Sequence, residues 1–156
     1  MDIHHAMIVR SRPERLYEAL TRAEDLSVWM AAPVVIEPPG PAEVGSVIEF
    51  RYEAHRQLRV AVTGLEAGRS VRWQVTQPIW FPAPVNAAQA ITWTLSPYES
   101  STLVDFRMGG WEAEDDAYAS VSYKWASFMM RLKIYAGDVR EIADLLERIE
   151  ARVREK

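Results

Sequence analysis

The sequence has 156 residues, of which 49% are hydrophobic and 26% are charged, a balance typical of an ordinary globular protein with one core. Its formal net charge of −4 argues against nucleic-acid binding, because phosphate backbones are bound by clustered positive charge. No run approaches the length of a membrane-spanning helix, and the N-terminus lacks the basic flank of a secretory signal. We therefore expect a cytoplasmic protein without stable membrane insertion. The absence of cysteine fits that compartment and excludes disulfides and thiolate nucleophiles.

The elements are expected in a simple order along the chain. Alternating polarity predicts a strand over residues 3–10, and Pro13 then opens a helix whose first turn tolerates its missing N–H. A second short helix is expected from about Ala23 to Met30 and is stopped by Pro33. An antiparallel meander follows, with alternating segments at residues 34–37, 46–53, 58–65, 70–76, 90–97 and 102–109. From about Ala117 the apolar period becomes helical, which predicts a long helix and an α+β fold class.

Strand parity predicts which face of the sheet meets the long helix, since successive side chains point to opposite faces. One face is expected to be charged and exposed, and the other to be apolar and buried. The inward set is His5, Met7, Val9, Ile48, Phe50, Tyr52, Leu58, Val60, Val62, Val71, Trp73, Val75, Ile91, Trp93, Leu95, Val104, Phe106 and Met108. This set indicates a concave wall that is rich in aromatic rings.

His5 and Tyr52 stand out in the inward set as side chains capable of acid–base chemistry. Each has two interpretations: His5 either finds a partner at the sheet edge or orients a ligand, and the Tyr52 hydroxyl bonds either protein or a ligand. Three histidines, two of them adjacent in one strand, do not make a metal site, and no nucleophile motif or phosphate loop occurs. We therefore expect no metal, no cofactor and no catalytic residues.

The tryptophans and the acidic run before the long helix also allow two interpretations. Trp73, Trp93 and Trp125 either fill the core or line a ligand site. The carboxylates from Glu112 to Asp116 are interpreted as residues that stabilise the start of the long helix, whose partial positive charge they complement, and not as a cation site.

A pattern of residues resembles a known family over roughly residues 3–137. It consists of Pro13-Glu14, Leu16-Tyr17, Ala19-Leu20-Thr21, Glu24, Leu26, Trp29, Val71-Arg72-Trp73, Ile91-Thr92-Trp93-Thr94-Leu95, Thr102-Leu103-Val104, Gly109, Trp125 and Leu132-Lys133-Ile134-Tyr135-Ala136-Gly137. The sequence resembles the polyketide cyclase/dehydrase and lipid-transport group of the START-related, Bet v 1-like (SRPBCC) superfamily, and within it the homologues of the heat-shock ATPase activator. The resemblance implies a helix-grip fold, in which a curved antiparallel sheet of about seven strands surrounds a long C-terminal helix and an apolar cavity.

Members of this superfamily act as carriers, cyclases and chaperone regulators, so three functions stay open. The leading hypothesis is binding or carriage of a small hydrophobic molecule, because an apolar, aromatic wall suits such a ligand. The alternatives are a cyclase- or hydratase-type enzyme that uses His5 and Tyr52, and a chaperone-regulating protein-interaction module. The candidate ligand-binding residues are His5, Trp29, Phe50, Tyr52, Trp73, Trp80, Phe81, Trp93, Phe106, Met108, Trp125 and Met129.

Connectivity predicts where a ligand would enter, because alternate turns of a meander lie at the same end of the sheet. Trp29, His55, Trp80, Phe81 and Trp111 are expected to meet at one rim, with Trp80 and Phe81 on a proline-rich flap. The opposite end, beside Gly40, Gly68 and Tyr98, is the alternative entrance.

The tail after Gly137 predicts a further helix. We expect residues 1–137 to form the helix-grip domain and residues 138–156 to form its C-terminal helical extension. Asp138 and Glu141 have capping-box spacing, and apolar residues then recur every three or four positions, at Val139, Ile142, Leu146, Ile149 and Val153. This narrow stripe predicts either docking on the domain's own surface or a homodimer through the helix.

Overall fold

We describe the protein from a computed structural model, for residues 1–53, 57–77, 89–137 and 139–155. The strands of this part of the chain are β1 (Ile3–Val9), β2 (Val34–Glu37), β3 (Val47–Arg51), β4 (Gln57–Glu66), β5 (Ser70–Gln77), β6 (Ala90–Tyr98) and β7 (Ser101–Met108). The helices are α1 (Pro13–Thr21), α2 (Ala23–Trp29), α3 (Asp116–Ala136) and α4 (Val139–Arg154). The predicted α+β class and the predicted order of elements are confirmed.

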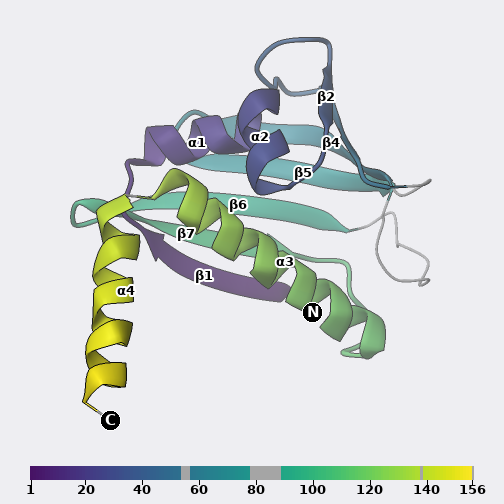
Figure 1. Ribbon diagram of the computed structural model, residues 1–156. Coiled ribbons are helices and arrows are strands. Elements are labelled where there is room, and N and C mark those ends of the chain that lie inside the picture. Colours follow the sequence, from purple (N-terminus) through teal and green to yellow (C-terminus); the bar gives the residue numbers. More distant parts are fainter. Residues whose placement is uncertain (54–56, 78–88, 138, 156) are drawn as a thin grey trace.

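The strands form one antiparallel sheet in the order β1-β7-β6-β5-β4-β3-β2. The meander from β2 to β7 pairs consecutive strands, and β1 closes the sheet by pairing with the last strand. Figure 1 shows α1, α2 and α3 on one side of the curved sheet, with α4 turned away from it at the end of α3. This is the helix-grip arrangement, and it leaves one face of the sheet for the core.

The two faces of the sheet divide as strand parity predicts. The inward side chains of the central strands are buried, including Phe50, Trp73, Trp93 and Phe106, each 0% exposed. The outward face carries ion pairs across neighbouring strands, such as Arg59 with Glu49 at 2.9 Å. Exposed pairs of this kind contribute little to stability, so most of the stability of the sheet comes from burial of its inward face.

The long helix α3 begins and ends as its sequence indicates. The Asp115 carboxylate accepts a hydrogen bond from the Tyr118 backbone N–H at 3.0 Å, so this member of the acidic run caps the helix, and Asp116 lies in its first turn. Gly137 ends the helix in an extended conformation, with φ −78°, and not in the left-handed one common at such positions. The buried face of α3 consists of Ala117, Val121, Trp125, Phe128, Met129, Leu132 and Ala136. Within the described residues, no helix combines the length and apolar character needed to cross a membrane.

Candidate ligand-binding site

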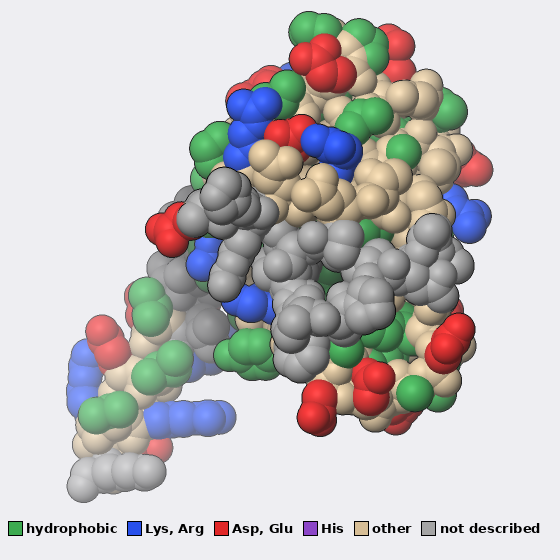
Figure 2. All heavy atoms as spheres, turned by 90° about the vertical axis from the view of Figure 1, so that its right-hand side faces the viewer, with side chains coloured by type: hydrophobic (Ala, Val, Ile, Leu, Met, Phe, Trp, Pro, Cys, Tyr) green, Lys and Arg blue, Asp and Glu red, His purple; other side chains and the backbone are tan. Residues whose placement is uncertain are grey.

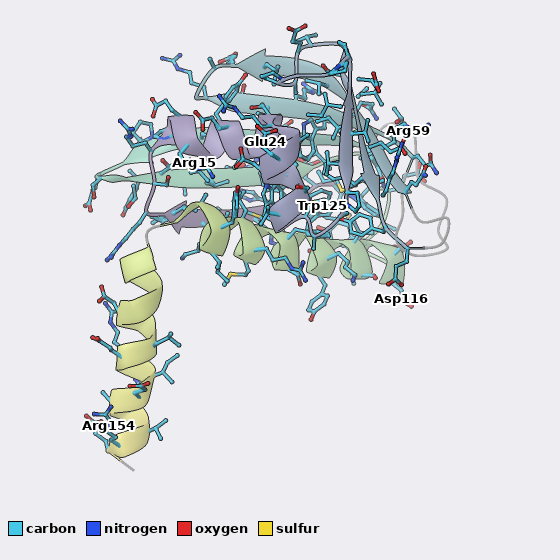
Figure 3. All side chains as sticks on the ribbon, turned by 45° about the horizontal axis from the view of Figure 1, so that its top comes forward. Arg15, Glu24, Arg59, Asp116, Trp125 and Arg154 are labelled. Carbon is cyan, nitrogen blue, oxygen red and sulfur yellow. The ribbon has the colours of Figure 1, made fainter. Side chains whose placement is uncertain are left out.

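The concave side of the sheet holds a cluster of aromatic rings centred on Trp93 of β6. Its ring centroid lies 4.9 Å from Phe106, 5.8 Å from Trp73, 5.9 Å from Trp29 and 6.1 Å from Trp125, all in edge-to-face geometry. These separations are the ones at which aromatic rings attract each other beyond simple burial. Trp125 reaches the cluster from α3 (Figure 3), so the helix and the sheet meet through aromatic contacts.

Strand register explains how the cluster is assembled. Trp93 is directly opposite Phe106 on β7 and opposite Val71 on β5, which places Trp73 one inward position further along. Side chains on directly opposed positions are the closest contacts between strands. The sequence therefore brings together rings that are widely separated along the chain.

Among the described residues, Trp29 does not lie at the rim where connectivity predicted it. It lies at the C-terminal end of α2, is 1% exposed and packs against Trp93 in the core. Its indole N–H donates a hydrogen bond to the Ala19 carbonyl at 2.8 Å. The rim was inferred from the connectivity of the elements, which does not show that α2 lies over the concave face.

Two indole N–H groups of the cluster have no hydrogen-bond partner within the described chain. They belong to Trp73 and Trp93, whose side chains are both 0% exposed. Buried donors are nearly always paired, and a missing partner costs about 1–3 kcal/mol. The wall was predicted to offer His5 and Tyr52 as its polar groups, but these N–H groups also face inward. The presence of a tryptophan already indicates an N–H donor. Whether that donor has a hydrogen-bond partner can be known only from the folded structure.

His5 and Tyr52 both have partners inside the protein. The Nε2 atom of His5 lies 3.1 Å from the Ser122 carbonyl and 3.2 Å from its hydroxyl. The Tyr52 hydroxyl donates to the Met30 carbonyl at 2.8 Å, and burial raises the pKa of this phenol. Both side chains are half-buried. The structure thus favours the interpretation in which His5 and Tyr52 are satisfied by protein groups.

The remaining candidate residues divide into those in the core and those that are not described. Phe50 and Met108 from the sheet and Met129 from α3 are buried in the core, where the Phe50 ring lies 6.2 Å from that of Trp73. His55, Trp80 and Phe81 lie outside the described residues. Trp111 is half-buried near the start of α3, where its ring meets that of Tyr118 at 5.5 Å.

Comparison with known proteins identifies the family. The family model described as "Activator of Hsp90 ATPase homolog 1-like protein" matches residues 10–137. The chain belongs to this family. Membership places it in the SRPBCC superfamily, as the resemblance implied, and leaves α4 outside the matched region. No curated protein sequence matches the chain.

Solved structures similar to this Hsp90-activator-like chain agree in fold. The solution structure of the Aha1 dimer from Colwellia psychrerythraea has 29% identity and a TM-score of 0.74, covering 87% of this chain and 96% of that one. A protein from Mesorhizobium loti has 19% identity and a TM-score of 0.73, covering 86% and 96%. A protein in the dynemicin biosynthetic locus has 16% identity and a TM-score of 0.66, covering 86% of this chain and 46% of its own. The last two support the fold alone.

An open groove lies at the end of the sheet where β4 turns into β5. It has a volume of about 750 Å³ and lies between the start of α1, the turn at Gly68 and the end of β6. Its walls include Tyr17, whose pKa is raised by burial, and three carboxylates, those of Glu14, Glu18 and Glu66. This is the end that the sequence offered as the alternative entrance, although Gly40 and Tyr98 do not line the groove.

A polar cluster that the sequence did not predict joins the three helices of the Hsp90-activator-like domain. Asp25 of α2 is 7% exposed and accepts hydrogen bonds from Arg15 of α1, at 3.0 Å, and from the Tyr135 hydroxyl of α3. The Arg15 guanidinium also lies over the Tyr135 ring, 5.3 Å from its centroid. The bond to Asp25 raises the pKa of both partners, so Arg15 is charged and Tyr135 is neutral near pH 7. No local pattern links residues 110 positions apart.

Proposed function

We propose that this protein binds a small hydrophobic molecule that carries a hydrogen-bond acceptor, such as a carbonyl oxygen, among the aromatic rings of the concave face. The unpartnered N–H groups of Trp73 and Trp93 carry this proposal. A core selected for packing alone would gain from phenylalanine or leucine at these positions, since an unmet buried donor is costly. An acceptor on a bound molecule removes that cost.

The apolar surroundings of the two indoles support the rest of the proposed ligand. The neighbouring strands offer apolar partners, with Val62 and Ile91 directly opposite Trp73. Met108 and Met129 belong to the same buried core. An apolar pocket with few, well-placed polar groups is typical of small-molecule sites. The rings contact one another in this structure, so we propose that they rotate apart to admit the ligand, with the flexible methionines adjusting around it.

Binding without turnover is the form of the proposal that the contacts favour. A cyclase-type reaction requires an acid or base free to reach the substrate, and His5 and Tyr52 were the available pair. Both are hydrogen-bonded to protein groups, and the raised pKa of Tyr52 makes its phenol a poor proton donor at neutral pH. Within the described part of the chain, His5 and Tyr52 therefore give the enzyme alternative no support.

Native mass spectrometry of the purified protein, followed by organic extraction, tests the proposal. We expect a fraction of the protein to carry a noncovalent mass that extraction releases as a hydrophobic compound containing oxygen. Under identical handling, a variant with Trp73 and Trp93 both replaced by phenylalanine should retain less of it, because phenylalanine keeps the apolar ring and removes the donor. If the double variant and the unsubstituted protein retain the compound equally, the two indole N–H groups do not bind it and the proposal fails.

A second copy of this chain is the protein partner that we propose. The Colwellia psychrerythraea relative, at 29% identity, is described as a dimer, which supports a homodimer here. Light scattering over a range of protein concentrations tests it, and a constant monomer mass would contradict it.

A further inference from the structure

The helix α4 exposes an apolar stripe that the domain does not cover. Leu146, Ile149 and Val153 are 55%, 50% and 68% exposed, and the helix extends away from the sheet and from α3 (Figures 1 and 3). An ion pair to the body of the domain joins Arg10 and Asp144 at 3.7 Å, with both side chains about half exposed. A single exposed pair of this kind contributes little, so the described side chains of α4 gain little stability from this contact with their own domain.

The spacing of the stripe is that of a helix that packs against another helix. Val139, Ile142, Leu146, Ile149 and Val153 alternate steps of three and four residues, which are the a and d positions of successive heptads. An isolated helix of 16 residues is marginal in water without such packing. Figure 2 shows hydrophobic side chains between acidic and basic ones on the arm that protrudes at its lower left.

The charges of this tail differ between its two halves. Residues 138–147 contain four carboxylates and one arginine, a net charge of −3, whereas residues 148–156 contain four basic residues and two glutamates, a net charge of +2. Two copies aligned in parallel would place like charges side by side. Two antiparallel copies would place each acidic half beside a basic half, and would also oppose the helix dipoles.

We propose that two copies of this chain associate through an antiparallel pair of α4 helices, with the twofold axis between Glu147 and Arg148. In this register Leu146 meets Ile149 of the second copy, and Ile142 meets Val153. Each a position then faces a d position, as two antiparallel heptad stripes require. The interface is self-complementary, as twofold symmetry demands. This inference rests on the proposed homodimer and names the surface that forms it.

The proposed interface is small, so we expect a weak dimer whose mass depends on concentration. Each helix is about 24 Å long, and a pair of this length buries less than the roughly 1,600 Å² of a standard interface. Sedimentation up to about 100 μM covers the range in which such a dimer is expected to form. The full chain should shift from monomer to dimer across this range.

Matched charge substitutions on α4 test the surface. Ile149→Glu places a carboxylate on the apolar stripe, whereas Ala151→Glu adds the same charge on the exposed face away from it. We expect Ile149→Glu to weaken the dimer at least about tenfold and Ala151→Glu to change it less than about threefold. If the dimer survives Ile149→Glu, another face forms it: the inference about α4 fails while the homodimer stands. A full chain that stays monomeric overturns both, and would fit α4 folding against the exposed Met130 and Ile134 of its own α3.

Disulfide trapping tests the orientation, and the absence of native cysteine leaves no background. Two single variants, Ile142→Cys and Val153→Cys, are prepared, one of them with a size tag, and are oxidised separately and as a mixture. The two positions lie about 16 Å apart along one helix, well beyond disulfide reach. Antiparallel pairing predicts the mixed disulfide and little of either like pair. Efficient like pairs with little mixed product would show parallel helices and overturn the proposed arrangement.

Discussion

Replacing Trp93 with alanine is expected to lower the free energy of unfolding by about 3–5 kcal/mol. Its indole is 0% exposed and contacts four other rings, with the nearest centroid, that of Phe106, 4.9 Å away. Truncation removes the apolar surface of a large side chain and leaves a cavity that rings fixed by two strands and α3 cannot easily fill. Chemical denaturation followed by circular dichroism measures the change.

Tyr98→Ala is the matched control, since it removes an aromatic ring from the same strand. Tyr98 is 48% exposed at the end of β6, so its loss should cost less than about 1 kcal/mol. If Trp93→Ala melts within a degree or two of the unsubstituted protein, the ring does not pack in the core and the inward assignment of β6 fails.

Replacing Asp25 with alanine is expected to cost about 2–3 kcal/mol, because it leaves two donors from other helices without an acceptor. Arg15 and the Tyr135 hydroxyl both bond this carboxylate, which is the shared contact of α1, α2 and α3. We expect a smaller loss of stability than for a fully buried ion pair, because the Arg15 side chain is 37% exposed and water can replace part of its bond to Asp25.

Glu24→Ala is the control for Asp25→Ala, since Glu24 precedes Asp25 in the first turn of α2 and is exposed (Figure 3). Both changes remove a carboxylate that favours the helix N-terminus, so the difference between them isolates the contacts of Asp25. In urea denaturation, Asp25→Ala should unfold at a clearly lower urea concentration than Glu24→Ala. Equal midpoints would show that the three-helix cluster contributes nothing measurable to stability.

Local patterns were sufficient to predict most of the fold. Alternation placed Trp73, Trp93 and Phe106 on one face, and a change to helical period located α3 and its buried residues. These features depend on neighbours within a few positions, so the sequence encodes them directly. The same reasoning placed Trp29 at a rim, because nothing local shows that α2 crosses the concave face.

The details of the candidate site required the three-dimensional arrangement. That Trp73 and Trp93 lack partners, while the indole of Trp29 bonds the Ala19 carbonyl, depends on which backbone groups each ring meets after folding. Asp25 and Tyr135 are similarly joined by tertiary packing alone. Residue types were enough to predict an apolar, aromatic concave face. Which polar groups on that face have hydrogen-bond partners follows only from interatomic distances in the folded protein.

The indole N–H resonances provide the most direct measurement of whether the buried donors bind a ligand acceptor. The six tryptophans give six such signals, which single Trp→Phe variants assign, and the protein is titrated with dodecanone and, separately, with dodecane. The account predicts that the ketone shifts the Trp73 and Trp93 N–H protons downfield as its oxygen accepts their hydrogen bonds, and that the alkane does not. The Trp29 N–H serves as the internal control, because it already donates to Ala19 at 2.8 Å and should move little. Identical responses to ketone and alkane at Trp73 and Trp93, or no response to either at saturation, would contradict the proposed site.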